Sequence, residues 1–142
     1  MHDLLLKNCR VVDGTGAEPF AADIAIAAGR FSRIAPNLNE PAARQVDAGG
    51  KFAAPGFIDI HRHSDAFVFR PGFGEVQLRQ GITTTVNGNC GLSVAPGPDK
   101  YRKEILQYLK PIIGTLPVGY EFDTFSEYLD LVDKQVLPIN FG

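Results

Sequence analysis

The sequence predicts an α/β fold, because strand patterns and helical patterns occupy two different regions of the chain. The first fifty or so residues contain short apolar segments between glycine turns and show no helical period. From about residue 53 to the end, apolar strand segments alternate with amphipathic helical segments, which is typical of βαβ units and a parallel sheet. We therefore expect one domain over residues 1–52 and a second over residues 53–142.

Strands alone are expected in the first region. Residues 4–13 form an apolar stretch that runs into the glycine turn Asp13-Gly14-Thr15-Gly16. Residues 23–27 alternate with a period of two, and the apolar pattern returns over residues 31–34, which indicates a hairpin. Residues 45–52 supply a further short strand and turn.

Strands and helices alternate in the second region. Residues 57–61 and 81–87 read as buried strands, and residues 136–141 begin a third. Residues 73–80, between the first two, have modest helical character. A complete (β/α)8 barrel needs about 250 residues. The region is therefore either a small open α/β domain or the start of a barrel that this chain does not complete.

Two longer helices are expected between the second and third strands. Asp99 is expected to cap the first of them. The segment Thr124-Phe125-Ser126-Glu127 is a capping box and opens the second. Their predicted apolar faces are Tyr101, Ile105, Tyr108 and Ile112 on the first helix, and Phe125, Leu129 and Val132 on the second.

Composition excludes several classes of protein. The chain is 44% hydrophobic and 21% charged, as in soluble globular proteins. Its net charge of −2 gives no electrostatic reason to expect nucleic acid or an anionic membrane as partner. No apolar run approaches a membrane span, and the start does not read as a signal peptide, so we expect a cytoplasmic protein. Two cysteines are too few for a disulfide framework, and Cys9 is expected to be a small buried hydrophobe.

The strongest chemical signal is the pair His61 and His63 at the end of a predicted strand. Alternate strand residues point the same way, so Asp59 is expected on the face of the two histidines, with Ile58 and Ile60 buried under helices on the other. Two imidazoles at the carboxyl end of a parallel strand can bind one divalent ion. Asp59 is expected to act from the second coordination sphere, accepting a hydrogen bond that orients His61. Two rings that are merely hydrogen-bonded at a strand end would give the same pattern.

Cys90 follows the next predicted strand. Glycines near it let the backbone bend so that its sulfur can reach inward. A cysteine in a turn is usually inert, but a thiolate is a strong zinc ligand. Together with His61 and His63 on the preceding strand, Cys90 makes a set of three candidate metal ligands.

These segments resemble the N-acyl-D-amino-acid deacylases, or D-aminoacylases, of the amidohydrolase superfamily. The resemblance rests on Asp13–Gly16, Pro55–Asp65, Gln80–Thr84 and Gly88–Gly91, in that order. The His-x-His strand indicates only the superfamily, whereas the cysteine after the second strand is much more specific. One departure is Arg62, where the family more often has a small polar residue. We expect its side chain to point away from the metal face.

The resemblance implies a fold, a cofactor and a reaction. Residues 1–52 would be the N-terminal part of a small β-sandwich, and residues 53–142 the first three or so units of a metal-dependent (β/α)8 TIM barrel. His61, His63 and Cys90 would bind zinc, as one or two ions. The reaction would be hydrolysis of a small-molecule N-acyl-D-amino acid to a carboxylate and a D-amino acid. The family's catalytic aspartate and its other histidine ligands belong to the part of the barrel missing from this chain, so we expect the chain alone to be inactive.

Two alternatives stay open from the sequence. The chain could belong to another amidohydrolase, such as a dihydropyrimidinase-like cyclic amidase, although Cys90 argues against it. It could also be a non-catalytic remnant that binds a metal or a partner.

Overall fold

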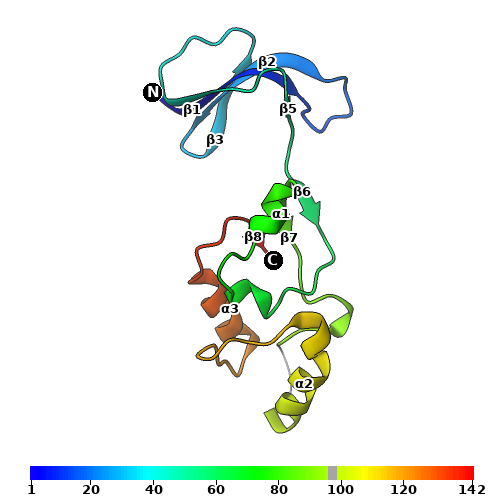
Figure 1. Cartoon of the computed structure of the whole chain (residues 1–142). Helices are drawn as coiled ribbons and strands as arrows, with labels where there is room; N and C mark the ends of the chain where they lie inside the picture. The colour runs from blue at the N-terminus through cyan, green and yellow to red at the C-terminus, as the bar shows by residue number, and fades with distance from the viewer. Residues whose placement is uncertain (96–98) are drawn as a thin grey trace. The chain divides into compact units, whose positions relative to one another are not determined.

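In the computed structural model, which describes residues 1–95 and 99–142, the chain divides into two compact units, Met1–Pro55 and Gly56–Gly142. Strands and helices are both present, which confirms the predicted α/β class (Figure 1). Within the described residues, none of the helices combines the length and the apolar character of a membrane span.

The first unit is a five-stranded sheet built around one long strand. This strand, β1 (His2–Val11), pairs antiparallel with β2 (Phe20–Ala27) and parallel with β4 (Ala42–Asp47). β3 (Arg30–Ala35) pairs antiparallel with β2, which confirms the predicted hairpin. β5 (Phe52–Ala53) pairs parallel with the far end of β1, so the segment predicted as one strand and turn contributes to two strands.

Small apolar side chains form the core of the first unit. Cys9 is 2% exposed among them, which confirms that it is a small buried hydrophobe. It clusters with Val11, Ala22 and Ile24, and a second buried cluster comprises Leu5, Ala25 and Leu38.

An ion pair between the buried Asp23 and the partly buried Lys7 supports the irregular middle of β1. The pairing of β1 with β2 shifts register between Leu6 and Cys9. Beside this point the Asp23 carboxylate accepts the N–H groups of Asn8 (2.7 Å) and Leu38 (2.9 Å) and lies 2.6 Å from the Lys7 ammonium. Burial raises the pKa of Asp23, but the hydrogen bonds and the charge of Lys7 lower it by a larger amount. The net pKa therefore lies below its ordinary value.

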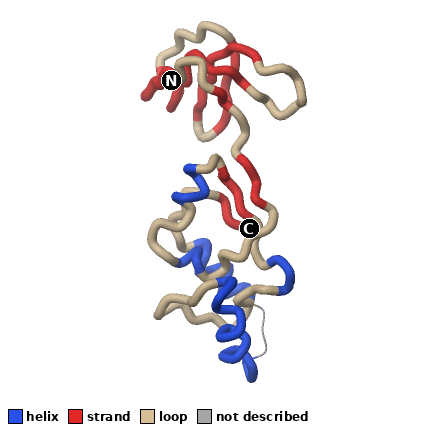
Figure 2. The backbone as a smooth tube through the Cα atoms, turned by 45° about the vertical axis from the view of Figure 1, so that its right-hand side comes forward, coloured by secondary structure: helices blue, strands red, loops and turns tan. Residues whose placement is uncertain are grey.

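The second unit contains a parallel sheet in the order β6 (Phe57–Asp59), β7 (Ile82–Thr85), β8 (Asn140–Phe141). The three strands lie side by side (Figure 2), and both pairings are parallel, as predicted. Between β6 and β7 the chain forms a 3-10 turn, η1 (Phe67–Phe69), and the short helix α1 (Glu75–Arg79).

Two short 3-10 turns and two helices connect β7 to β8. The turns are η2 (Asn89–Gly91) and η3 (Asp99–Tyr101), and the helices are α2 (Arg102–Ile113) and α3 (Phe125–Asp133). α3 begins with the predicted capping box. α2 begins at Arg102 with Tyr101 as its N-cap residue, later than predicted, and the side chain of Asp99 lies outside the described part of the chain.

The predicted apolar faces of α2 and α3 were correct at Ile105, which packs against the core, and at Val132, which is buried, but wrong at most other positions. In α2 the core side chains include Leu109, whereas Tyr108 is 78% exposed. In α3 Tyr128 is buried and Leu129 is exposed. The reason is a shared core in which Tyr128 packs edge-on against Phe69. Each helix is oriented so that the side chains that fit this core face inward.

The strand carrying the histidines also differs from the prediction. β6 ends at Asp59 rather than at His61. Ile58 in β6 and Ile60 just after it are 62% and 71% exposed instead of buried under helices, because in the described residues no helix covers these side chains.

Candidate metal centre

The ends of two adjacent parallel strands bring the candidate ligands together. His61 and His63 follow β6, and Cys90 follows β7. Asp59 is paired with Thr85 at the ends of these strands, so the segments that leave them start level. Beyond the strands, the N–H of Arg62 donates to the carbonyl of Val86 at 3.0 Å. This hydrogen bond keeps the two segments side by side.

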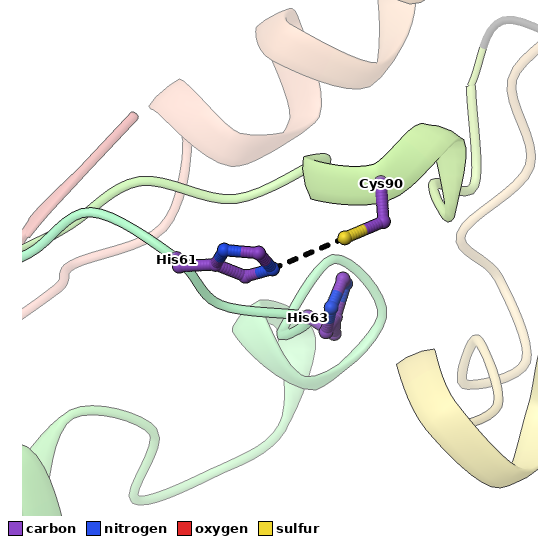
Figure 3. Close-up of side chains that lie close together, drawn as sticks. All are labelled: His61, His63 and Cys90. Atoms are coloured by element: carbon purple, nitrogen blue, oxygen red, sulfur yellow. Dashed lines mark hydrogen bonds between the residues drawn. The ribbon is translucent and has the colours of Figure 1, made fainter.

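The three predicted ligands converge (Figure 3). One possible ligand atom from each of His61, His63 and Cys90 lies within 4.8 Å of the others. Cys90 Sγ is 3.2 Å from His61 Nε2, and the two imidazole rings meet edge to face with centroids 5.4 Å apart. Over residues 1–95 and 99–142, this is the one group of three or more His, Cys, Asp or Glu side chains with such spacing.

This donor set fits a zinc ion. Zinc bound tetrahedrally by nitrogen and sulfur holds its donor atoms roughly 3.4–3.6 Å apart. The 3.2 Å between Cys90 Sγ and His61 Nε2 is close to that separation, and the 4.8 Å limit on the whole group requires only small side-chain movements. In addition, His63 Nδ1 is buried without a hydrogen-bond partner among the described residues. A buried polar nitrogen with no partner is costly unless a ligand or another group satisfies it.

Cys90 occupies an unusual backbone conformation. Its φ is 58°, in the left-handed region, and it lies between Gly88 (φ 74°) and Gly91 (φ 68°). For a residue with a side chain this conformation costs about 1–2 kcal/mol, so the surrounding structure has to hold it in place. The glycines provide the sharp bend that the sequence predicted and direct the cysteine toward His61.

Asp59 does not bond to the imidazole of His61 as expected. Its carboxylate accepts the backbone N–H of His61 at 3.2 Å and the guanidinium of Arg62 at 3.0 Å. The prediction assumed an extended strand as far as His63, whereas the chain turns after β6 and returns Arg62 toward Asp59. Arg62 therefore does not point away from the site, and its Nε also reaches Ser64 Oγ at 3.3 Å.

The same contacts keep Asp59 ionised. Burial raises the pKa of its carboxyl group, but the hydrogen bonds from the Arg62 guanidinium and the His61 N–H, together with the positive charge of Arg62, lower it by more. The net pKa lies below its ordinary value. Asp59 thus contacts the backbone of His61 rather than its ring.

The sequence analysis did not identify two asparagines that join the loop after β6, which carries the histidines, to the loop after β7, which carries Cys90. Asn87 accepts the N–H of Ser64 at 2.9 Å, and Asn89 donates to the carbonyls of Val86 (3.0 Å) and Arg62 (3.4 Å). Their signal in the sequence was the pattern Asn-Gly-Asn-Cys-Gly. Side-chain amides in a glycine-rich loop commonly satisfy backbone groups there.

A cavity of about 630 Å³ adjoins the histidines. Besides His61 and His63, its lining includes the charged side chains of Arg62 and Arg70 and the amide of Gln77. It therefore offers positive charge and hydrogen-bond donors next to the candidate ligands.

Together these features define an α/β protein with a candidate metal centre at the carboxyl ends of parallel strands. The chain belongs to the Amidohydrolase family, whose sequence profile matches residues 44–119.

Known relatives agree with this membership. The chain is 46% identical over 97 residues to N-acyl-D-glutamate deacylase of Alcaligenes xylosoxydans xylosoxydans, a match that covers 68% of this chain and 20% of the relative. It is 33% identical over 142 residues to D-aminoacylase of the same organism, covering 97% of this chain and 28% of the relative. The crystal structure of N-acyl-D-glutamate deacylase from Bordetella bronchiseptica, complexed with zinc and a phosphonate inhibitor, matches with a TM-score of 0.77 and 32% identity.

The structural match covers 99% of this chain and 28% of the crystallised one. The predicted resemblance to the N-acyl-D-amino-acid deacylases is therefore confirmed. This chain spans from a fifth to somewhat more than a quarter of the length of these relatives.

Proposed function

We propose that this chain provides the metal-binding face of a zinc-dependent hydrolase that cleaves the amide bond of N-acyl-D-amino acids to a carboxylate and a D-amino acid. The observation that carries the proposal is the convergence of His61, His63 and Cys90 within 4.8 Å. The similarity to D-aminoacylase and to N-acyl-D-glutamate deacylase supports the substrate class. The zinc bound by the Bordetella relative supports the choice of metal.

In this proposal the residues of the chain divide the work. His61, His63 and Cys90 hold the ion, which when bound supplies Lewis-acid activation of the amide carbonyl. The cavity beside the two histidines accommodates the substrate, and Arg62 and Arg70 on its wall attract an anionic group.

The chain by itself offers no suitable general base near these ligands in its described part. Asp59 is ionised but engaged by Arg62. Asp65 is 2% exposed, and its Oδ1 accepts a hydrogen bond from Ser93 Oγ at 2.7 Å. We therefore expect negligible deacylase activity from purified residues 1–142 with zinc and N-acetyl-D-amino acids. Robust zinc-dependent turnover would contradict this expectation.

The fold belongs to the same proposal. The sheet order β6-β7-β8 follows the order in the sequence, and helical segments lie between successive strands, as at the start of a (β/α)8 barrel. We assign residues 53–142 to the first three or so units of such a barrel and residues 1–52 to part of a small β-sandwich. In the described part of the chain β6 forms an edge of this sheet, which is consistent with a sheet that continues beyond it.

The decisive experiment is a zinc titration of this chain and of its Cys90→Ala variant by calorimetry. We expect one-to-one binding by the unaltered chain and a large loss of affinity in the variant, because the thiolate is one of three donors. Equal binding by both proteins would mean that the cysteine is not a ligand.

A dihydropyrimidinase-like activity is not favoured, since the relatives named above are an N-acyl-D-glutamate deacylase and a D-aminoacylase.

A further inference from the structure

The side chain of Asn89 joins the loop of Cys90 to the segment that carries both histidines. We infer that Asn89 is a positioning residue, which holds Cys90 Sγ opposite the imidazoles of His61 and His63. This inference rests on the proposed metal centre and adds a residue that determines its geometry.

The amide of Asn89 has acceptors on both sides of the site. Its Nδ2 donates to the carbonyl of Val86, the residue after β7, at 3.0 Å. It also reaches the carbonyl of Arg62, the residue between the two histidines, at 3.4 Å. The Val86 carbonyl also accepts the N–H of Arg62 at 3.0 Å. One side chain therefore connects the cysteine loop to the histidine segment at the point where that segment is already hydrogen-bonded to Val86.

The backbone of Asn89 closes the turn around Cys90. Its carbonyl accepts the N–H of Leu92 at 2.9 Å, so one hydrogen bond spans Cys90, while the side-chain bond to Val86 anchors the residue before the cysteine. Cys90 needs such a constraint, because its φ of 58° is unfavourable for a residue with a side chain. A strained conformation persists only where the surrounding structure enforces it.

Loss of the amide removes this constraint. The loop can then relax toward right-handed backbone angles, and the sulfur moves away from His61 Nε2, which now lies 3.2 Å from it. Groups that orient metal ligands typically change metal affinity by roughly 10- to 100-fold when they are removed. We expect a loss of this size for Asn89→Ala.

The chain contains a matched control in Asn140. Its Nδ2 also makes two hydrogen bonds to the same sheet, to the Thr83 carbonyl (3.2 Å) and to Thr84 Oγ1 (3.1 Å). Asn140 is not among the groups that contact His61, Arg62 or Cys90. Asn140→Ala therefore removes an amide of the same kind without disturbing the candidate ligands.

The test measures zinc affinity by competition with a chromophoric chelator, in the whole chain and in both variants. Cobalt is used as a second probe, because the charge-transfer absorption of a thiolate–cobalt bond reports whether Cys90 is a ligand. Melting of each metal-free protein shows whether the fold is retained. We expect Asn89→Ala to bind zinc roughly 10- to 100-fold more weakly and to lose most of the thiolate–cobalt band at saturating cobalt, whereas Asn140→Ala matches the unaltered chain.

The outcomes separate this inference from the proposed function. If the unaltered chain does not bind zinc, the proposed metal centre is wrong. If it binds zinc and Asn89→Ala retains the same affinity and cobalt band, or if Asn140→Ala loses as much, the positioning role is wrong. Should Asn89→Ala fail to fold, Asn89→Asp keeps the shape of the side chain but lacks the donor. The added negative charge would by itself strengthen cobalt binding, so it cannot explain a weaker thiolate–cobalt band. A weaker band in that variant therefore supports the inference, and an unchanged band overturns it.

Discussion

Zinc binding between the two loops should stabilise the second unit, Gly56–Gly142, and leave the first unchanged. His61 and Cys90 are 29 residues apart in the sequence, yet their donor atoms lie 3.2 Å apart. An ion held by both therefore bridges loops that separate when the parallel sheet unfolds. An ion that binds only the folded state raises the free energy of unfolding by RT ln(1 + [Zn]/Kd).

The expected effect is large enough to measure by thermal melting. At a free zinc concentration a hundredfold above Kd, the free energy of unfolding rises by about 2.7 kcal/mol. For a domain of this size, 1 kcal/mol shifts Tm by roughly 4–8 °C. Zinc should therefore raise the Tm of the second unit by roughly 10–20 °C. Cys90→Ala should lose most of this rise, because His61 and His63 belong to one loop and an ion bound to them alone bridges nothing.

The composition of the chain makes the assay specific to the second unit. There is no tryptophan, and the four tyrosines are Tyr101, Tyr108, Tyr120 and Tyr128. Tyrosine emission therefore follows the unfolding of Gly56–Gly142 alone, and it is recorded with zinc and with a chelator.

Cys9→Ala serves as the matched control for this melt. It removes the other thiol, which is buried in the first unit, and should keep the full zinc-induced rise. An equal rise in Cys90→Ala and in the unaltered chain would refute the bridging of the two loops.

Two further predictions concern groups outside the ligand set. Because the pKa of Asp23 is below its ordinary value, its stabilising effect is fully present above the unfolded pKa of about 3.9 and is lost as the pH falls through the folded value. Asp23→Asn should cost the first unit about 3 kcal/mol at neutral pH and flatten its acid dependence, as measured by circular dichroism; a steep acid loss in the variant would contradict this. Tyr128→Phe removes the hydroxyl that donates to the Asp65 carbonyl at 3.1 Å and should cost the second unit about 1 kcal/mol in urea unfolding. Since burial raises the pKa of Tyr128, its contribution is present below the unfolded pKa of about 10 and is lost at higher pH; an equal alkaline loss in the variant would assign that loss to another group.

Local patterns in the sequence identified most elements but not their ends or their buried faces. The capping box at Thr124 was correct because its hydrogen bonds are made within one turn of helix. The inward face of α3 was assigned wrongly because Tyr128 turns toward aromatic partners from distant parts of the chain, among them Phe69 and Phe122. The helical spacing of apolar residues does not show which of them packs against partners elsewhere in the chain.

The candidate metal centre shows the same division. Residue type and spacing were enough to select His61, His63 and Cys90, because imidazole and thiolate are the ligands that zinc prefers and each follows a strand pattern. The sequence did not show that Arg62 turns back to Asp59, or that Asn89 connects the two loops, since both depend on hydrogen bonds formed only when the loops lie together.

The sequence by itself therefore determined which side chains are candidate metal ligands and that they follow two successive strand patterns. Tertiary structure decided that these side chains meet. β6 and β7 pair in parallel with Asp59 opposite Thr85, and this register brings Cys90 Sγ within 3.2 Å of His61 Nε2 across 29 residues of chain. The physical reason is that side-chain chemistry is carried by single residues, whereas a distance between two loops is set by the hydrogen bonds that fix the strands beneath them.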